Sequence, residues 1–427
     1  MLKIIYLWLI ILIIQNTFST AMAGEEQSVV DSLIQKALKK NPDIIAAEFE
    51  YQAVRFKEKA SGWLPDPTIS IVGSNLPRGS LSLDQTPMSG ISIGYTQKIP
   101  WPGKLVNQKR IAGLKAQNKN IAFSAWKNTV VRLVKSAYFE FTYWRLAEDI
   151  VNDNIALMEA LFEVARTKYA NGLGLAQDVL SAQTSLSKIE DRKLNVIKMK
   201  KAALANLNRL TNESNYSLGD IPAVLPLIGE SSAQIELLIE SASKDNPLLE
   251  LSRNEVELAN GKKSLVKNGY WPDITLAVEY RLREEAPMDA VNGEDFISAR
   301  VGLSLPVWFW KKQNNLNKAA EKESRTARFR QESIERKIEY EITNAFLELE
   351  RKRQGFHLYD EAIIPQAEAA LESANIAYQV GKVDFLNLLT AQMRLFEMQI
   401  EKLGMLKDYN QTLAALDEIV GKNYGEN

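Results

Sequence analysis

Two stretches of the chain place an apolar residue at every 3.5 positions on average. Steps of alternately four and three residues from Val130 to Tyr169 meet apolar side chains at eleven of twelve positions. The matching series from Ile338 to Ala377 is apolar at nine of twelve positions. Such a period, held over six heptads, predicts helices that pack lengthwise as coiled coils. We therefore expect long helices over residues 103–170 and 311–379, and 68 residues of continuous helix would measure roughly 100 Å.

A second pattern alternates apolar residues with polar or small ones. It covers residues 274–283 and 297–305, with a shorter example at 91–96. A period of two predicts strands with one apolar and one polar face. We expect two β-hairpins, at about 68–97 and 274–305. The second-copy runs are close to the ~9–11 residues that a tilted strand needs to cross a bilayer, although a half-buried soluble hairpin would alternate in the same way.

The order of these elements occurs twice, because the chain contains an internal repeat. Four short motifs return in the same order at offsets of 205 to 209 residues. They are Asn41-Pro42 with Asn246-Pro247, Leu64-Pro65-Asp66 with Trp271-Pro272-Asp273, Ile99-Pro100 with Leu305-Pro306, and Leu180-Ser181-Ala182-Gln183 with Leu389-Thr390-Ala391-Gln392. We expect a first repeat at 24–211, a connector at 212–232 and a second repeat at 233–427.

Each repeat would contain a first helix, a hairpin, a long helix and a return helix. The first helices are expected at about 29–62 and 235–268 and the return helices at 177–210 and 385–420. A bend or local change of packing is expected at Pro365, because proline lacks the N–H that a helix interior uses.

The N-terminus indicates export. Residues 1–23 carry one positive charge, Lys3, then an apolar run at 4–14, and end in Ala21-Met22-Ala23, a small-x-small cleavage pattern. A run of 11 residues is too short for a spanning helix, which needs about 20. We interpret residues 1–23 as a cleaved signal peptide.

Composition excludes much chemistry. The 427-residue chain has no Cys, one His (His357) and a net charge of −1. Thiol chemistry, Cys-ligated metals and sites that need two imidazoles are excluded, and bulk positive charge for binding nucleic acid is absent. We expect a structural or transport protein that is not an enzyme, with no catalytic residues, no metal site and no cofactor.

Two hairpins supply four strands, which cannot close a barrel by themselves. Open sheet edges are not tolerated in lipid, and the smallest well-known membrane barrels have about eight strands. If the strands lie in a membrane, several chains must share one barrel. Three chains would supply twelve strands, with Glu279, Arg281 and Arg300 facing a watery lumen.

With these motifs in order, the sequence resembles the TolC family of outer-membrane efflux factors, most closely its heavy-metal efflux branch. The resemblance spans nearly the whole mature chain. Besides the tandem repeat, it is carried by these motifs: Asn41-Pro42-Asp43, Trp63-Leu64-Pro65-Asp66-Pro67, Gln97-Lys98-Ile99-Pro100-Trp101-Pro102-Gly103-Lys104, Leu305-Pro306-Val307, Ile364-Pro365-Gln366-Ala367 and Tyr378-Gln379-Val380-Gly381-Lys382-Val383-Asp384-Phe385-Leu386.

The resemblance implies a mainly α fold with a small β part. It implies a homotrimer in the outer membrane, with a twelve-stranded β-barrel continued by a long periplasmic α-helical barrel of coiled coils. Such a protein is a passive exit duct that contacts outer-membrane lipid. A periplasmic adapter and an inner-membrane pump of the RND type would be its partners, and it would bind no nucleic acid.

The resemblance also assigns roles to the turns between the long and return helices. They would form a periplasmic tip that is closed at rest and docks the adapter, through Asn171, Gly172, Leu173, Gly174, Val380 and Gly381. Asp178 and Tyr378 match positions that hold the tip shut. Lys382 lies one position before the basic residue of the best-known member. Asn387 stands where many members have Asp, and Asp384 is the candidate to replace it. Each polar residue here also fits an ordinary turn or solvated helix cap.

Other interpretations remain open from the sequence. They are a type I secretion exit channel for polypeptides, a periplasmic adapter, a non-channel periplasmic coiled-coil protein and an enzyme. The adapter is disfavoured by low strand content, and the coiled-coil protein by the matched hairpins. The exported substrate, whether metal, drug or protein, cannot be read from the chain, although likeness to the metal branch suggests heavy-metal cations.

Overall fold

The computed structural model describes residues 29–213, 222–226, 228 and 234–421. The expected signal peptide and most of the expected connector lie outside these residues. The chain divides into two compact units. Unit 1 consists of Met1–Glu48, Phe123–Pro247 and Glu335–Asn427, and unit 2 consists of Phe49–Ala122 and Leu248–Ile334.

Both units take segments from both sequence repeats. The repeats are therefore not separate compact bodies. The physical reason is that one repeat exposes apolar stripes that it cannot bury alone, so that equivalent elements of the two copies pack on each other.

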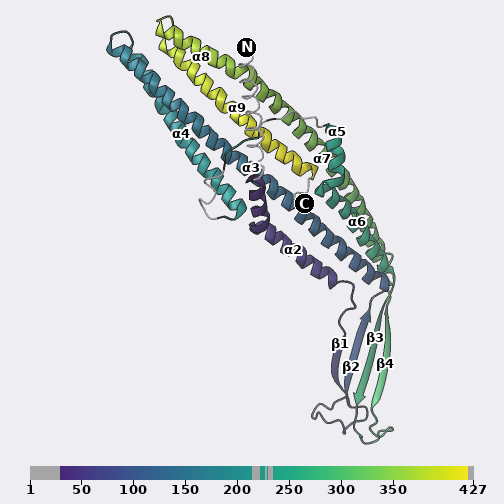
Figure 1. Ribbon diagram of the computed structural model, residues 1–427. Coiled ribbons are helices and arrows are strands. Elements are labelled where there is room, and N and C mark those ends of the chain that lie inside the picture. The colour runs from purple at the N-terminus through teal and green to yellow at the C-terminus, as the bar shows by residue number, and fades with distance from the viewer. Residues whose placement is uncertain (1–28, 214–221, 227, 229–233, 422–427) are drawn as a thin grey trace, which may run out of the picture. The chain divides into compact units, whose positions relative to one another are not determined.

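Unit 1 contains two helical hairpins (Figure 1). The first joins α3 (Pro102–Ala170), whose residues from Phe123 onwards belong to unit 1, to α4 (Ala176–Thr211). The second joins α8 (Ile364–Gln379) to α9 (Phe385–Val420). Among the described residues, no helix is both long enough and apolar enough to cross a membrane.

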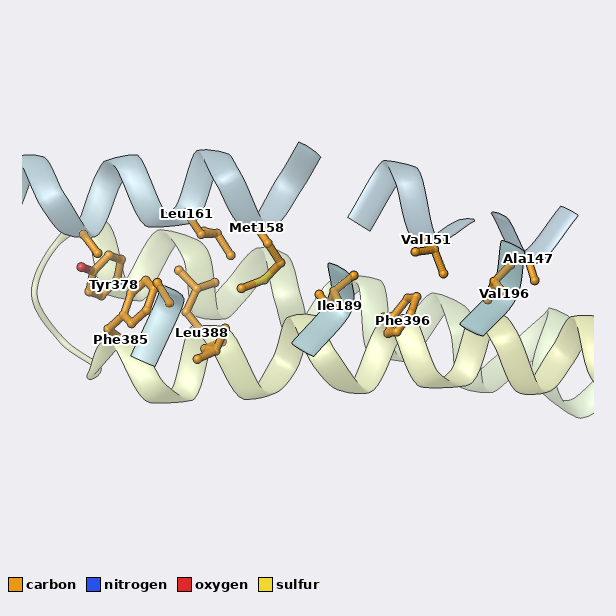
Figure 2. Close-up of a cluster of buried hydrophobic side chains, with 13 residues drawn as sticks. Ala147, Val151, Met158, Leu161, Ile189, Val196, Tyr378, Phe385, Leu388 and Phe396 are labelled. Carbon is orange, nitrogen blue, oxygen red and sulfur yellow. The ribbon is translucent and has the colours of Figure 1, made fainter. Parts of the chain in front are cut away.

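A shared apolar core joins the two hairpins, as Figure 2 shows. Val151, Met158 and Ala165, which belong to the 3.5-residue stripe of α3, are all buried. Phe385 and Phe396 reach the same core from α9, and Ile189 reaches it from α4. Each fully buried large side chain of this kind contributes about 1.5–3 kcal/mol, so the apolar stripe accounts for the association of the hairpins.

One polar pair lies inside this region. Gln392 of α9 donates from Nε2 to Oδ1 of Asn154 on α3 at 2.9 Å, and both side chains are buried. The Oε1 atom of Gln392 has no partner among the described atoms. A buried polar pair of this type fixes the register of packed helices, because a shift leaves both groups unpaired.

The first helical stretch of each repeat is divided, where we expected one helix. In the first repeat, residues 29–40 form one helix and α2 (Pro42–Lys59) forms the next. In the second repeat, α5 (Ile235–Asp245) is followed by α6 (Pro247–Lys267) and a 3₁₀ turn, η1 (Asn268–Tyr270). The divisions fall at the repeated Asn-Pro motif.

The Asn-Pro motif explains the break in both repeats. Proline has no N–H for the preceding helix and is favoured at the first position of a new one. Asn41 caps the new helix, since its Oδ1 accepts the N–H of Asp43 at 2.9 Å. The Asn41 Nδ2 donates to the carbonyl of Leu210 at 2.9 Å, and the equivalent Asn246 donates to Ile419 at 2.6 Å. The motif thus ties each first helix to the end of its return helix.

The second long segment, expected as one helix over 311–379, is also interrupted. It consists of α7 (Lys312–Leu358), a π-helical turn η2 (Tyr359–Ile363) and α8. In η2 the N–H of Ile364 donates to the carbonyl of Tyr359, five residues earlier. Pro365 follows at the start of α8. The local change expected at Pro365 is therefore a π turn, which accommodates the missing donor without ending the rod.

Unit 2 contains the sheet. Its strands are β1 (Thr68–Ser74), β2 (Gly90–Ile99), β3 (Asp273–Leu282) and β4 (Phe296–Ser304). They are antiparallel and lie side by side in the order β1-β2-β3-β4 (Figure 1). The central β2–β3 pairing joins the hairpins of the two repeats, with Tyr95 opposite Val278. The outer edges of β1 and β4 have no strand partner in the described chain.

The base of the sheet is held by Asp273, the first residue of β3. Its Oδ1 accepts the N–H of Trp101 at 3.0 Å and a hydrogen bond from the ammonium of Lys104 at 2.6 Å. The Trp101 and Trp271 rings stack with their centroids 4.7 Å apart. The stacked tryptophans and the contacts of Asp273 therefore lock the end of the first hairpin to the start of the second.

Candidate functional site

The first turn of interest, Asn171–Gly174, connects α3 to α4. The N–H of Leu173 donates to the carbonyl of Lys168 at 2.9 Å, and the N–H of Gly172 donates to Tyr169 at 3.0 Å. These two bonds are those of a Schellman cap, which needs a left-handed residue after the helix. Gly172 takes that conformation, with φ of +70°.

The second turn, Val380–Val383, connects α8 to α9 and is built in the same way. The N–H of Lys382 donates to Ala377 at 2.8 Å, and the N–H of Gly381 donates to Tyr378 at 3.2 Å. Gly381 has φ of +71°. Tyr378 thus occupies the same helical position in the second repeat as Tyr169 does in the first.

The surroundings of the two tyrosines differ. Tyr378 is 6% exposed and Tyr169 is 52% exposed. The Tyr378 ring packs against Phe385, the first residue of α9, with centroids 5.4 Å apart. The Lys168 ammonium lies 4.0 Å from the centroid of the same ring. Tyr378 therefore belongs to the core in Figure 2, whereas Tyr169 faces solvent in the single chain.

The Tyr378 hydroxyl is in an unusual position. It is buried and has no hydrogen-bond partner among the described atoms. Burial raises the pKa of this hydroxyl, and the negative charge of Asp178 raises the pKa further. Asp178 lies in the first turn of α4, where the positive end of the helix dipole favours a carboxylate. The charge of Asp178 on α4 thus acts on a hydroxyl of the second hairpin.

The other candidate gate residues lie on the second turn. Lys382, Asp384 and Asn387 are all exposed. Asp384 is the N-cap residue of α9 and makes no capping bond through its side chain, while its carbonyl accepts the N–H of Asn387 at 3.1 Å. In the single chain these side chains are free to meet groups from outside, and they do not join the cluster around Tyr378.

The candidate docking residues form the outer surfaces of the two turns. Asn171, Gly172, Val380 and Gly381 are exposed, and Gly174 is half-buried. Leu173 is 79% exposed, which places an apolar side chain in solvent at the end of the first hairpin. Leu173 is therefore available to a partner, although a single exposed apolar side chain does not by itself identify a binding surface.

Sequence reasoning missed Lys168. Besides lying over the Tyr378 ring, its ammonium donates to the Tyr378 carbonyl at 3.0 Å. The only local signal is that of a cation in the last turn of α3, a position where basic residues are common because of the helix dipole. That signal cannot indicate a partner 210 residues away.

The sheet carries the other candidate residues. Glu279 and Arg281 lie on one face of β3 and form an ion pair at 3.5 Å, and Arg281 also donates to the Ser92 hydroxyl at 3.2 Å. Arg300 stands opposite Ala277, two residues from Glu279, and so lies on the same face. The three predicted lumen residues therefore share one polar face.

The opposite face of the sheet is apolar and exposed in the single chain. It carries Ile69, Ile71, Ile91, Ile93, Tyr95, Leu276, Val278, Tyr280, Leu282, Ile297, Val301 and Leu303. This continuous apolar surface crosses all four strands. A soluble monomer rarely exposes such a surface, so the face needs a hydrophobic partner.

The described residues offer little for metal chemistry. Within this part of the chain, no group of three or more His, Cys, Asp or Glu side chains is placed to hold a metal ion. The single histidine, His357, faces Glu361 on an exposed part of the second long segment at 3.3 Å.

Comparison with known sequences gives a family match in both repeats. The family described as outer membrane efflux protein matches residues 33–213 and again residues 238–422. The chain is similar to outer membrane protein TolC of Vibrio cholerae, with 21% identity over 412 residues that cover 95% of this chain and 93% of that protein.

A second relative and a solved structure extend the comparison. The cobalt-zinc-cadmium resistance protein CzcC of Cupriavidus metallidurans is 26% identical over 188 residues, which cover 43% of this chain and 42% of that protein. The outer membrane protein VceC from Vibrio cholerae has a TM-score of 0.78 at 17% identity, over 94% of this chain and 98% of that chain. At this identity the structural likeness shows a shared fold.

Proposed function

Because the chain belongs to the outer membrane efflux protein family, we propose that it is the exit duct of a tripartite efflux system. The family places it in the outer membrane, as an efflux protein. In our proposal it extends into the periplasm and receives its cargo from an adapter and an inner-membrane pump. The observation that carries the proposal is the family match in both repeats, together with a sheet whose two edges are open.

The open edges support a trimer. One chain supplies four strands, and the outer edges of β1 and β4 would expose unpaired backbone groups. Such groups cost several kcal/mol each in lipid, so the edges must pair with strands of other chains. Three chains would close a barrel of twelve strands, with the apolar face toward lipid. Detergent dependence of the extracted protein tests this, since a monomer that stays soluble without detergent would contradict it.

The polar face would then line the lumen. Glu279, Arg281 and Arg300 would each occur three times around the pore. Arg300→Glu should shift the ion selectivity of the pore toward cations, because it reverses a charge in the water-filled path. The reversal potential under a salt gradient measures this shift, and Arg325→Glu, the same charge reversal at an exposed position on α7, is a matched control.

The two hairpin turns would form the periplasmic tip. We propose that their exposed surfaces, at Asn171, Gly172, Leu173, Gly174, Val380 and Gly381, dock the adapter. Asp178 and Tyr378 would hold the tip shut at rest, and Lys382, Asp384 and Asn387 would meet groups of a neighbouring chain. The burial of Tyr378 and the effect of the Asp178 charge on its pKa support this assignment.

Conductance tests the gate. Exposed charge pairs contribute roughly 0–1 kcal/mol each, so a threefold set can be overcome by adapter contacts. Asp178→Ala combined with Tyr378→Phe should raise the closed-state conductance of the full chain in planar bilayers. Tyr169→Phe, the same change at the equivalent exposed position, should leave it unaltered. Unchanged conductance of the double variant would contradict the gate, and a wild-type chain that forms no pore would contradict the duct.

We propose that the cargo includes divalent metal cations. The support is the similarity to a cobalt-zinc-cadmium resistance protein over 43% of this chain. A passive duct need not bind its cargo, so this proposal does not require a metal site. Deletion of the gene should make the host sensitive to cobalt, zinc or cadmium. Sensitivity to organic drugs alone, or loss of a secreted polypeptide, would assign a different cargo.

A further inference from the structure

We propose that Lys168 is a positioning residue of the gate, which holds Tyr378 in its closed position by binding both its carbonyl and its ring. This inference rests on the proposed function, because it assigns a residue to the same tip. Lys168 belongs to the first hairpin and Tyr378 to the second. The contact therefore ties the two repeats together within one chain, at the end where the turns lie.

Two interactions of the Lys168 ammonium carry the inference. Nζ donates to the Tyr378 carbonyl at 3.0 Å and lies 4.0 Å from the centroid of the Tyr378 ring. The first is a hydrogen bond assisted by charge, and the second is a cation–π contact at short range. Since Lys168 is half-buried and Tyr378 is buried, water competes weakly for the ammonium.

The electrostatics of α8 favour this contact. The last turn of α8 contains no basic residue of its own. The carbonyls at the end of a helix carry a partial negative charge that a nearby cation stabilises. Lys168 supplies that cation from α3. The Tyr378 carbonyl also accepts the N–H of Gly381, so the ammonium binds at the start of the second turn itself.

The contact occurs in one direction only, from the first repeat to the second. The residue equivalent to Lys168 in the second repeat is Ala377, which has no charge and cannot make the reciprocal contact with Tyr169. Tyr169, the equivalent of Tyr378, has an exposed side chain. Gly174 supports the arrangement, because a Cβ there would lie 3.1 Å from the Cβ of Lys168. Glycine at 174 thus leaves the stem of Lys168 undisturbed.

The mechanical consequence follows from the core. Tyr378 contacts both Lys168 and Phe385. Any movement of the second hairpin away from α3 must break the hydrogen bond and the ring contact together. Lys168 therefore raises the free energy of separating the two hairpins, and its loss should make the open tip more frequent without changing the pore.

Planar-bilayer recordings on the full chain test this role. Lys168→Met keeps the length of the stem and removes the charge, so we expect the closed-state leak to rise roughly three- to tenfold. Lys168→Arg keeps the charge and the donors, so it should restore most of the closed state. Lys188→Met, at an exposed position on α4, should behave as wild type. A leak from Lys168→Met equal to that of wild type would overturn the proposal.

A second measurement does not depend on conductance. Trypsin cleaves after lysine, and Lys382 lies exposed on the second turn. Local opening controls such cleavage, so Lys168→Met should speed the cut at Lys382 by a similar factor, and Lys168→Arg should not. If the wild-type chain forms no pore but this difference in cleavage appears, the proposed exit duct is contradicted and the proposed role of Lys168 is supported. If pores form and the cleavage rates are equal, only the proposed role of Lys168 is contradicted.

A double variant tests whether Lys168 acts through the ring of Tyr378. Tyr378→Leu removes the ring and keeps the carbonyl. In Lys168→Met with Tyr378→Leu, the combined rise in leak should be smaller than the product of the single rises, because each change removes the same contact. Effects that multiply fully would show that Lys168 does not act through the Tyr378 ring, which would overturn that part of the proposal.

Discussion

The two hairpin turns have the same backbone hydrogen bonds but different surroundings. Gly172 and Gly381 have φ of +70° and +71°, and the capping bonds fall at equivalent residues. Yet Tyr378 is buried where Tyr169 is exposed. The same contrast holds one turn into the return helices, where Leu389 is 5% exposed and Leu180 is 63% exposed.

The internal repeat therefore duplicates the local backbone structure of the turn but not the burial of the equivalent side chains. In the single chain the second-repeat turn faces the shared core, and the first-repeat turn presents the equivalent side chains to solvent. The exposed copy is therefore available for partners, whether a neighbouring chain or an adapter. The buried copy is suited to holding the two hairpins together.

The largest expected effect compares the paired leucines. Leu389→Ala should lower the free energy of unfolding by about 2–5 kcal/mol, because it leaves a cavity in the core. Leu180→Ala should lower it less, because within one chain no cavity forms around a side chain that is 63% exposed. Chemical denaturation of the detergent-solubilised protein measures both. Equal losses would break the comparison, by showing that the first-repeat face is also covered in the assembly.

The paired glutamines come next. Gln392→Ala removes the donor to Asn154 within the core, and should cost about 1–3 kcal/mol of stability since it leaves a buried polar group unpaired. Gln183→Ala, at the equivalent exposed position, should be nearly neutral. Replacing both Asn154 and Gln392 by Leu should recover much of the loss. A double variant as unstable as the single one would refute the pairing as its cause.

The two turn glycines should respond alike. Gly172→Ala and Gly381→Ala each force a side chain into left-handed backbone, which costs about 1–2 kcal/mol. Apart from the adjacent residues of the chain, no atom of the described residues lies within 4 Å of the added Cβ at either site, so the cost arises from the backbone alone. Asparagine at either position should be milder than alanine. Thermal unfolding of the four variants checks this, and unequal alanine effects would show that the turns differ in more than their surroundings.

The smallest effect concerns the Tyr378 hydroxyl. Asp178→Asn removes one of the two causes that raise its pKa, so the pKa should fall toward its usual value. Because the folded-state pKa is raised, the neutral hydroxyl adds stability below about pH 10, and this is lost as pH rises through the folded-state pKa. Ultraviolet titration, with Tyr378→Phe as the blank, isolates this residue among the tyrosines.

A control variant sharpens the pKa measurement. Asp149→Asn removes a carboxylate roughly five helical turns from Lys168 on α3 and should leave the Tyr378 pKa unchanged. An equal shift in both variants would mean that Asp178 acts only through the net charge of the protein.

Much of the fold could be predicted from the spacing of apolar residues along the chain. The 3.5-residue stripe identified the long helices, and the period of two identified four strands, because each pattern records which face a residue buries. The divisions at Asn41 and Asn246 and the π turn before Pro365 were harder. They depend on how the backbone satisfies hydrogen bonds around a proline, which the hydrophobic pattern does not record.

The candidate site was only partly visible in the sequence. Asp178 and Tyr378 were named because they match positions near the turn glycines in the family that the sequence resembles, and their roles in gating stay predictions. Lys168 escaped notice because its partner is 210 residues away in the chain. A contact of that kind exists only after two helices have packed in one register.

By itself, the sequence determined the repeat, the helical and strand periods and the two glycine turns, because these depend on interactions between near neighbours. Only the tertiary structure decided which copy of each repeated side chain is buried. Tyr169 and Tyr378 have nearly the same local chemistry, and so do Leu180 and Leu389. Their burial depends on which faces of the two hairpins meet, and that is a property of the packed whole, since burial requires atoms from elsewhere in the chain.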